Sequence, residues 1–496
     1  MCELTIVSGD TRRIVPAEPG ALVSDLLRQA VPSFALPCAG NHTCGKCRVQ
    51  ITGEIEPPDE AERRLLDEAD LAAGIRLACS CRLAGNATVT LQAEGKSKII
   101  AWNQTPPFER TETGYGIAVD IGTTTVAMQM FDRASGAVLA ERLAENAQRG
   151  FGADVISRIE ACKTEGLDVL SGRINDQLEQ MAAECLQEAG VDHIEESVVT
   201  GNSTMLHLYE GLDPASLAVV PFDVQSFFGC MSRRTLAGAP VYLPRCIGAY
   251  VGADIVCAIL ASDMLSGGVQ LLADIGTNGE MALARDGRLL CCSTAAGPAF
   301  EGAGLSCGMP AAPGAIRAVW REGDKIRFET VQDQPAQGVC GSGILDALAV
   351  MLETEAIDDS GFLEEDFAIG DSGVQIDQRD VRQIQLAKSA ICAGLITLME
   401  EEGVDAAGIE RFCIAGGFGS SMNFDSACAI GLFPAALHDK TGFIGNGALG
   451  GASMLLMNKS LREKSEQFAR QATELSLSAS PAFMDYYVDC MSFMEF

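Results

Sequence analysis

Positively charged side chains are scarce in this chain. Its 496 residues include 36 Lys or Arg against 67 Asp or Glu, which gives a formal net charge of −31. Nucleic acids and anionic membranes bind clustered Lys and Arg, so this balance argues against both as partners. Apolar residues still make up 47% of the chain, too many for a disordered protein, and the length allows three or four lobes with separate cores.

Long apolar runs and an export signal are missing as well. No run of 18 or more apolar residues occurs, so we expect no segment to span a bilayer. The N-terminal residues lack the basic and apolar regions of a secretory signal. The 19 cysteines are therefore expected to be reduced thiols, some of them metal ligands, in a cytoplasmic protein.

Five cysteines gather between residues 38 and 81. The first three follow the pattern Cys38-x5-Cys44-x2-Cys47, and Cys79 and Cys81 come about thirty residues later. The plant-type ferredoxin spacing is C-x4-C-x2-C with a distant fourth cysteine, so the pattern predicts one iron–sulfur cluster. Structural zinc, which usually takes two short knuckles of similar spacing, is the weaker alternative. Alternate residues of an extended stretch share a face, which leaves Cys79 and Cys81 both open as the fourth ligand.

Histidine is too rare to favour a Rieske-type centre, which needs two histidine ligands, because the chain holds only four. His42, inside the cysteine loop, is therefore interpreted as a solvated loop side chain. The apolar pattern around the loop predicts a small α+β domain over residues 1–95, followed by a linker over 96–113 that contains Pro106 and Pro107. The predicted strands are 3–9, 12–17, 48–55 and 87–93, and the predicted helices are 22–30 and 59–70.

The rest of the chain contains an internal repeat. The sequence Asp-Ile-Gly-Thr occurs at residues 120–123 and again at 274–277, and each copy continues through a strand, a hairpin turn and a second strand. A shared context of this length is hard to reach by chance. It predicts two related α/β lobes, at 114–270 and 271–460, with a C-terminal tail at 461–496.

Each repeated loop has the composition of a phosphate-binding loop. Glycine lets the backbone approach phosphate oxygens, hydroxyl and N–H groups bind them, and an aspartate at the strand end holds Mg²⁺ through water. Two matched copies predict a nucleotide polyphosphate clamped between the lobes, and a third glycine loop predicts an adenosine site. The expected nucleotide-site residues are Asp120, Gly122, Thr123, Thr124 and Thr125, then Asp274, Gly276, Thr277, Asn278 and Gly279, and finally Gly416, Gly417, Phe418 and Gly419.

Two further glycine motifs do not predict separate nucleotide sites. Gly95-Lys96-Ser97 ends like a P-loop, but Thr90 stands where the first glycine of that loop is required. Residues 445–450 match G-x-G-x-x-G without the βαβ unit that a dinucleotide fingerprint needs. We interpret them as a tightly packed helix start near the nucleotide.

Taken together, these motifs resemble a known combination. The two Asp-Ile-Gly-Thr loops and residues 416–419 resemble the ASKHA superfamily of actin-like, sugar-kinase and chaperone ATPases, and the ferredoxin-like head joined to them resembles the reductive activators of corrinoid proteins. The resemblance implies an α+β ferredoxin-like (β-grasp) N-terminal domain followed by a two-lobed α/β ASKHA ATPase domain. It extends over roughly residues 1–95 and 114–460, and four more stretches contribute to it: 76–79, 151–158, 201–205 and 296–302.

The resemblance also implies a function. Members of that family pass an electron through a 2Fe–2S cluster to the Co(II) corrinoid of a methyltransferase system and restore Co(I), using ATP. Their Arg-Leu-Ala-Cys element favours Cys79 as the fourth cluster ligand, beside Cys38, Cys44 and Cys47. The implied cofactors are the 2Fe–2S cluster, ATP and Mg²⁺; the implied partners are a corrinoid protein and a low-potential electron donor, with a homodimer as one option. Only about 19 residues separate the head from the ATPase, so we expect a short form without the linker-and-middle domain of longer members.

Two other functions remain open from the sequence. One is a small-molecule kinase with a redox-sensing cluster, in which Asp254 is either the general base or a helix cap. The other is a nucleotide-gated iron–sulfur binding protein with little turnover. ATPase assays with and without a corrinoid protein, and a search for a phosphorylated product, distinguish them.

Overall fold

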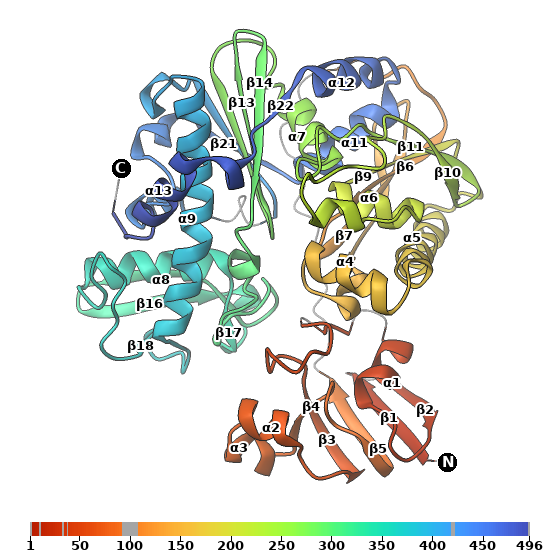
Figure 1. Cartoon of the computed structure of the whole chain (residues 1–496), viewed down its shortest axis with the longest axis vertical. Helices are drawn as coiled ribbons and strands as arrows, with labels where there is room; N and C mark the ends of the chain where they lie inside the picture. Colours follow the sequence, from red (N-terminus) through yellow and green to blue (C-terminus); the bar gives the residue numbers. More distant parts are fainter. Residues whose placement is uncertain are drawn as a thin grey trace.

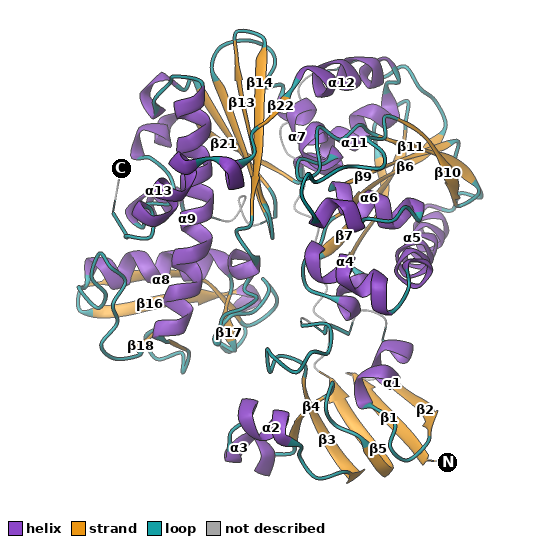
Figure 2. Cartoon of the chain, in the orientation of Figure 1, coloured by secondary structure: helices purple, strands orange, loops and turns teal. Residues whose placement is uncertain are grey.

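The computed structural model describes residues 2–8, 11–31, 34–36, 38–91, 108–417 and 422–494. A small N-terminal domain lies beside two larger lobes, each built on a sheet that is flanked by helices (Figure 1, Figure 2). Among the described residues, no helix is both long and apolar enough to cross a membrane.

The N-terminal domain is a five-stranded sheet in the order β2-β1-β5-β3-β4. Strands β1 and β5 are parallel, and the other neighbours are antiparallel. This arrangement confirms the predicted ferredoxin-like domain. Its elements are β1 Cys2–Ser8, β2 Thr11–Ala17, α1 Val23–Ala30, β3 Arg48–Ile55, α2 Glu60–Leu65, α3 Glu68–Ala72, β4 Ile75–Leu77 and β5 Leu83–Leu91.

Two details of this domain differ from the sequence prediction. The predicted helix 59–70 is divided into α2 and α3, because the Asp67 side chain accepts a hydrogen bond from the backbone N–H of Asp70 (2.6 Å) and caps a second helix. The short strand β4 has no counterpart in the prediction. Residues 9 and 10, where the first predicted strand ends and the connection to the second begins, lie outside the described residues.

The internal repeat of the sequence corresponds to a structural repeat. The two large sheets have the orders β10-β11-β9-β6-β7-β8 and β21-β20-β12-β13-β14-β22. In each, the strand before the repeated loop pairs antiparallel with the next strand and parallel with a later one, β9 or β20. The first sheet contains β6 Tyr115–Ile121, β7 Thr125–Asp132, β8 Val138–Glu145, β9 Glu196–Gly201, β10 Cys230–Leu236 and β11 Ala239–Leu243. The second contains β12 Gln270–Ile275, β13 Gly279–Arg285, β14 Arg288–Thr294, β20 Arg411–Ala415, β21 Thr441–Gly445 and β22 Thr473–Glu474.

Two helices lock the lobes together. Helix α7 (Ala253–Ser262) follows the last strand of the first sheet in the chain but packs against β12 and β13 of the second sheet. Helix α11 (Gly447–Met457) follows β21 of the second sheet but packs against β6 and β9 of the first. The helices also contact each other so closely that a Cβ atom on Gly451 would lie 2.1 Å from the carbonyl oxygen of Cys257. Residues 445–450 are therefore the tight entry into α11, as the sequence predicted.

Other elements complete the two lobes. The segment predicted as a C-terminal tail packs on the second lobe: β22 pairs with β14, and α13 contacts α9. The remaining helices are α4 Val155–Thr164, α5 Leu167–Ala189, α6 Ser203–Glu210, α8 Gly341–Glu353, α9 Gln378–Glu401, α10 Phe424–Ala429, α12 Ser460–Gln471 and α13 Pro481–Asp489. The remaining strands are β15 Ala315–Glu322, β16 Lys325–Thr330, β17 Gly338–Val339, β18 Phe367–Ala368 and β19 Gln375–Ile376.

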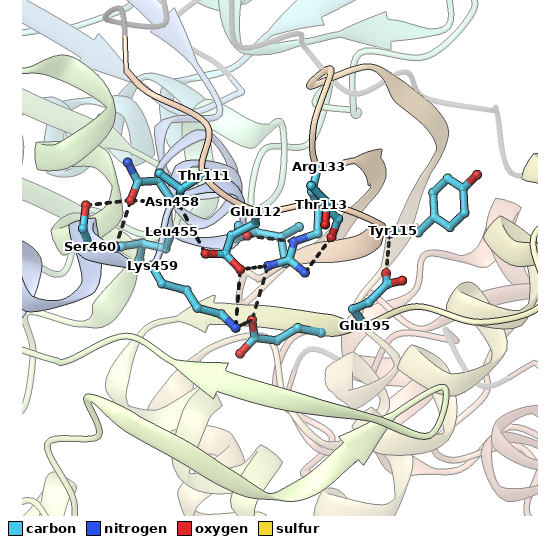
Figure 3. A network of polar contacts seen from close by, with 12 residues as sticks. Thr111, Glu112, Thr113, Tyr115, Arg133, Glu195, Leu455, Asn458, Lys459 and Ser460 are labelled. Carbon is cyan, nitrogen blue, oxygen red and sulfur yellow. Dashed lines mark hydrogen bonds and ion pairs between the residues drawn. The ribbon is translucent and has the colours of Figure 1, made fainter.

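A charged network fixes the point where the chain enters the first lobe (Figure 3). Arg133, which is 3% exposed, lies 3.0 Å from Glu112 and 3.6 Å from Glu196. Lys459, at the start of α12, lies 3.6 Å and 3.1 Å from the same two carboxylates. The end of the predicted linker is thus attached to the junction of α11 and α12, while Pro106 and Pro107 lie outside the described residues.

Candidate functional site

Four cysteine side chains meet at one end of the N-terminal domain. Cys38, Cys44 and Cys47 come from the loop between α1 and β3, and Cys79 comes from the turn between β4 and β5. The thiols interact as two pairs, Cys38 with Cys44 and Cys47 with Cys79. Across the described ranges, no three His, Cys, Asp or Glu side chains are grouped to hold a single metal ion. Two pairs of thiols fit two irons better than they fit one tetrahedral zinc.

The surroundings of Cys81 differ from those of the other four thiols, since the charges that act on it are those of Arg76 and neighbouring carboxyl groups. Residues 78–80 form a turn in which the N–H of Cys81 donates to the carbonyl of Leu77 (2.8 Å), so Cys79 and Cys81 do not share a face as an extended stretch would require. The Cys81 thiol is fully buried, and burial raises its pKa to about 11. The geometry therefore favours Cys79 over Cys81, the choice that the sequence spacing alone left open.

The cysteine loop directs backbone N–H groups at its own thiols. Ala39, Gly40, His42 and Gly45 all have positive φ angles, between 49° and 80°, which wrap the loop tightly. Burial opposes ionisation of Cys38, but hydrogen bonds from Thr43 and Cys44 lower the pKa of its thiol to about 7. A loop that stabilises thiolate in this way suits a cluster ligand.

The prediction that His42 is a solvated loop side chain is wrong. His42 is half-buried, and its Nδ1 lies 2.7 Å from Ser80 Oγ and 3.5 Å from Cys79 Sγ. The contact depends on the reversal of the chain at residues 78–80, which no local pattern around His42 reveals.

A buried ion pair, which no local sequence pattern indicated, supports the turn that carries Cys79. Glu62 is fully buried and accepts two hydrogen bonds from Arg76, at 2.8 Å and 2.5 Å, and one from the N–H of Leu77 at 2.9 Å. Two parallel N–H donors on one carboxylate give a geometrically specific contact. The Arg-Leu-Ala-Cys element therefore has a structural role in positioning its cysteine.

The two repeated loops face each other across the lobes. Asp120 is the next-to-last residue of β6 and Asp274 is the next-to-last residue of β12, at equivalent places in the two sheets. Thr124 Oγ1 lies 2.9 Å from Thr277 Oγ1, and Thr277 donates a hydrogen bond to Glu301 at 3.1 Å. The hydroxyl groups predicted to bind phosphate thus bind each other here. Of the other predicted residues, Gly122 and Thr123 lie in the first loop and Gly276 and Asn278 in the second, while Thr125 and Gly279 begin β7 and β13.

Polar side chains that the sequence did not single out hold the first loop. Asn146 donates to the carbonyl of Gly122 (2.8 Å), and Asn202 donates to Thr123 Oγ1 (3.0 Å). Arg158 is fully buried and donates to the carbonyl of Thr123. Burial, with the neighbouring Arg149, lowers the pKa of the Arg158 guanidinium to about 9. Residues 151–158 and 201–205, which entered the prediction only as resembling stretches, supply two of these three contacts.

Five carboxyl groups from both lobes gather around the loops: Asp120, Asp254, Asp274, Glu280 and Glu301. Burial raises the pKa of Asp120 to about 6, although Asn446 donates to it at 2.9 Å. Burial and the charge of Asp120 raise the pKa of Asp274 to about 7 and that of Asp254 to about 8. So much negative charge at one place fits a cation such as the magnesium of Mg-nucleotide, held through its water shell.

Two of these carboxyls have unused hydrogen-bonding capacity. One oxygen of Glu280 and one of Glu301 are buried without a hydrogen-bond partner among the described residues. Burial, followed by the charges of Asp254 and Asp274, raises the pKa of Glu280 well above its ordinary value. A water or a hydrated cation would satisfy both oxygens.

The third glycine loop adjoins the second phosphate loop. Gly416 has φ 94°, and a Cβ atom there would lie 2.8 Å from an oxygen of Asp274, so only glycine fits. Gly417 follows it, whereas Phe418 and Gly419 lie outside the described residues.

Comparisons with known proteins match three consecutive regions. A model of the 2Fe-2S iron-sulfur cluster binding domain matches residues 5–84, one of the RACo middle region matches 115–266, and one of the C-terminal ASKHA domain of RACo matches 268–495. The chain is 34% identical over 422 residues to the corrinoid activation enzyme RamQ of Eubacterium limosum, covering 77% of this chain and 71% of that one. It is 27% identical over 420 residues to a Co(II) methylated amine-specific corrinoid protein reductase of Methanosarcina barkeri, covering 76% and 77%.

One solved structure matches along nearly the whole length. It is a reductive activator for corrinoid, iron-sulfur protein, with 26% identity, a TM-score of 0.71 and coverage of 99% of this chain and 98% of that one. The expectation of a short form without a middle domain is therefore wrong. The segment that matches the middle region is the first of the two repeated lobes, so counting the residues before the first Asp-Ile-Gly-Thr loop could not reveal it.

Proposed function

This chain belongs to the family of reductive activators of corrinoid proteins, and from that premise we propose that it passes an electron from a low-potential donor through a 2Fe–2S cluster to the Co(II) corrinoid of a methyltransferase system, which restores Co(I). The observation that carries the proposal is one chain in which a four-thiol domain is joined to two lobes with facing phosphate loops. The named relatives are corrinoid activators and reductases, so neither the kinase nor the binding-protein alternative is favoured.

The cluster would be held by Cys38, Cys44, Cys47 and Cys79 and supplies reversible storage of one electron. The chain holds these thiols in place through the left-handed loop and through the Glu62–Arg76 pair. Replacing Cys79 with serine should abolish the normal cluster spectrum, whereas Cys81→Ser should keep about two irons per chain. A normal cluster in the Cys79 variant would move the fourth ligand elsewhere.

Mg-ATP would lie between the two repeated loops, with adenosine near residues 416–419. Asp120 and Asp274 would hold Mg²⁺ through water, and the loop N–H and hydroxyl groups would bind the phosphates. Thr124 and Thr277 must exchange their mutual hydrogen bond for phosphate oxygens. Nucleotide binding thereby changes the contact between the lobes, which is the conformational change that an uphill electron transfer requires.

Contacts between the N-terminal domain and the first lobe offer a route for coupling. The N–H of Leu36, two residues before Cys38, donates to the carbonyl of Arg149 (3.2 Å), and the Arg28 guanidinium lies 5.3 Å from the centre of the Phe151 ring. Both partners belong to the 3₁₀ helix Ala147–Phe151, whose capping residue Asn146 holds the first phosphate loop. The first phosphate loop and the cluster loop are therefore connected through a single short helix, so a change in one can be transmitted to the other.

Cobalt-state spectroscopy tests the proposed function. The reduced protein is mixed with candidate corrinoid proteins, with and without Mg-ATP. We expect the Co(II) to Co(I) conversion to require ATP, the reduction of the cluster to proceed without it, and the client to accelerate ATP hydrolysis. Corrinoid reduction at full rate without nucleotide would contradict the coupling. We also propose that the protein is cytoplasmic. We further propose that it forms a homodimer, which analytical ultracentrifugation would detect.

A further inference from the structure

One face of α9 holds the C-terminal segment of the chain. Four of its side chains within residues 385–392 make contacts there: Gln385, Lys388, Ser389 and Cys392. The first three donate hydrogen bonds to backbone carbonyls within residues 487–492, with Gln385 at 2.9 Å from Met491 and Lys388 at 2.7 Å from Ser492. The lysine is 1% exposed and also donates to the carbonyl of Gly431 at 3.2 Å. This segment is therefore firmly seated on α9.

The fourth contact is of a different kind. Cys392 Sγ lies 2.7 Å from Cys490 Sγ, at the C-terminal end of α13. Cys392 is fully buried and Cys490 is 8% exposed. Phe483 and Tyr487 pack around the two thiols. Neither cysteine belongs to the cluster loop or to the phosphate loops, so the proposed function leaves this pair unused.

We propose that Cys392 and Cys490 form a reversible disulfide, oxidised by a small-molecule disulfide such as oxidised glutathione. The Cys490 thiolate attacks one sulfur of the oxidant and releases one reduced thiol. The Cys392 thiolate then attacks the Cys490 sulfur of the mixed disulfide and releases a second. Two protein thiols are oxidised, one small disulfide is reduced, and the two protons pass to the leaving thiolates.

The surroundings agree with this order of attack. Cys490 is the more accessible thiol, and a hydrogen bond from Cys392 lowers its pKa, assisted by the nearby ammonium of Lys388. Burial raises the pKa of Cys392, which suits a thiol that reacts second. The resulting bridge would join α9 covalently to α13 and constrain the unfolded chain between residues 392 and 490.

Peptide mapping of the full-length holoprotein tests the proposal. The protein is equilibrated anaerobically in glutathione buffers of increasing oxidised fraction, then alkylated in denaturant and digested. We expect a linked peptide pair containing Cys392 and Cys490, lighter by two hydrogens, that disappears with dithiothreitol. The melting temperature of the oxidised protein should rise by roughly 5–10 °C.

Matched variants sharpen the test. Cys490→Ser should abolish the linked peptide and the rise in melting temperature. Cys413→Ala, which changes another buried cysteine of the same lobe, should keep both. Alkylation of both thiols at every glutathione ratio, or glutathione on each cysteine without a bridge, would overturn the proposal. The wild-type measurement decides even if a variant does not fold.

Discussion

The two copies of the phosphate loop share a sequence motif but are stabilised in opposite ways. Donors surround the first loop: Asn146, Arg158 and Asn202 bind its carbonyl and hydroxyl oxygens. Carboxyl groups surround the second, and two of them, Glu280 and Glu301, each keep a buried oxygen unpaired within the described part of the chain. The protein's own donors therefore hold the first loop in place, whereas the carboxyl groups at the second retain buried oxygens that a cation would satisfy. The two copies share the strand arrangement but differ by one residue in loop length, and they have divided the tasks.

Strand register explains much of this difference. In the second sheet, Asp274 lies directly opposite Glu280 on the neighbouring strand, whereas in the first sheet Asp120 lies opposite Ala127. Residues directly opposite each other in an antiparallel pair have neighbouring side chains. The loop between the paired strand ends is one residue shorter in the second copy, 276–278 against 122–125, and the residue opposite the aspartate is a carboxylate in one copy and carries a methyl group in the other.

The largest expected effect is on ATP hydrolysis, and it differs between the two aspartates of the repeat. Asp274→Ala should lower client-stimulated ATP hydrolysis about a thousandfold, because it removes the carboxylate in the cation-requiring copy. Asp120→Ala should cost about a hundredfold, since one oxygen of that carboxyl already accepts a hydrogen bond from Asn446. Steady-state ATPase rates measure both, with the exposed Asp439→Ala as control. Undiminished hydrolysis in either variant would refute its role with Mg²⁺, and equal losses would refute the division of tasks.

Arg158→Met tests whether the first loop is preformed. The variant leaves the buried carbonyls of Thr123 and Gly152 without their guanidinium donor, which should cost about 2–3 kcal/mol of unfolding free energy. Urea unfolding monitored by circular dichroism measures the change. Arg379→Met, at a side chain that is 92% exposed, should stay within about 0.5 kcal/mol of the wild type. A similar stability for both variants would show that the first loop does not depend on the hydrogen bonds of Arg158.

The Asp254 carboxyl tests how strongly burial and the neighbouring carboxyl groups of both copies oppose its ionisation. Its pKa is raised to about 8 in the folded protein, so folding binds a proton there and the associated stability is lost as the pH rises from about 4 to about 8. Asp254→Asn removes this dependence and should be more stable than the wild type by about 2 kcal/mol at pH 8, with little difference at pH 4. Thermal unfolding without nucleotide across this range measures it. A constant difference between the two proteins at all pH values would contradict the assignment.

The unequal surroundings of the loops also show which parts of the site a sequence can reveal. The repeat, the cysteine spacing and the fold class depend on local patterns, and these predicted the two sheets and the thiol group. Arg158 and Asn202 act through contacts across the first lobe, and His42 acts through a turn 36 residues away, so spacing carries no sign of them. Glu280 was visible within the repeated motif, but its importance depends on strand register. Local motifs therefore predicted which residue types form the site. The burial and the charges around those residues became known only from the three-dimensional structure.

The smallest expected effect concerns the hydroxyl contact where the two copies meet. Thr124→Val removes the hydrogen bond to Thr277 and the contact of the same hydroxyl with the Glu301 carboxyl, and should cost about 1 kcal/mol. Thr277→Val removes the same hydroxyl contact together with the 3.1 Å hydrogen bond to Glu301, and should cost about 1 kcal/mol more. Urea unfolding measures both values, and isothermal titration with Mg-ATP measures the accompanying change in affinity.

If the contact belongs to the nucleotide-free arrangement, as we propose, ATP must compete with it in the wild type. Each variant loses a hydroxyl that binds phosphate but also loses the contact that ATP must break. The two effects partly cancel, so the affinity for Mg-ATP should fall less than tenfold. A loss of affinity as large as that of a true phosphate ligand, with no loss of stability, would show that these hydroxyls serve the nucleotide alone and that the copies are not held together by them.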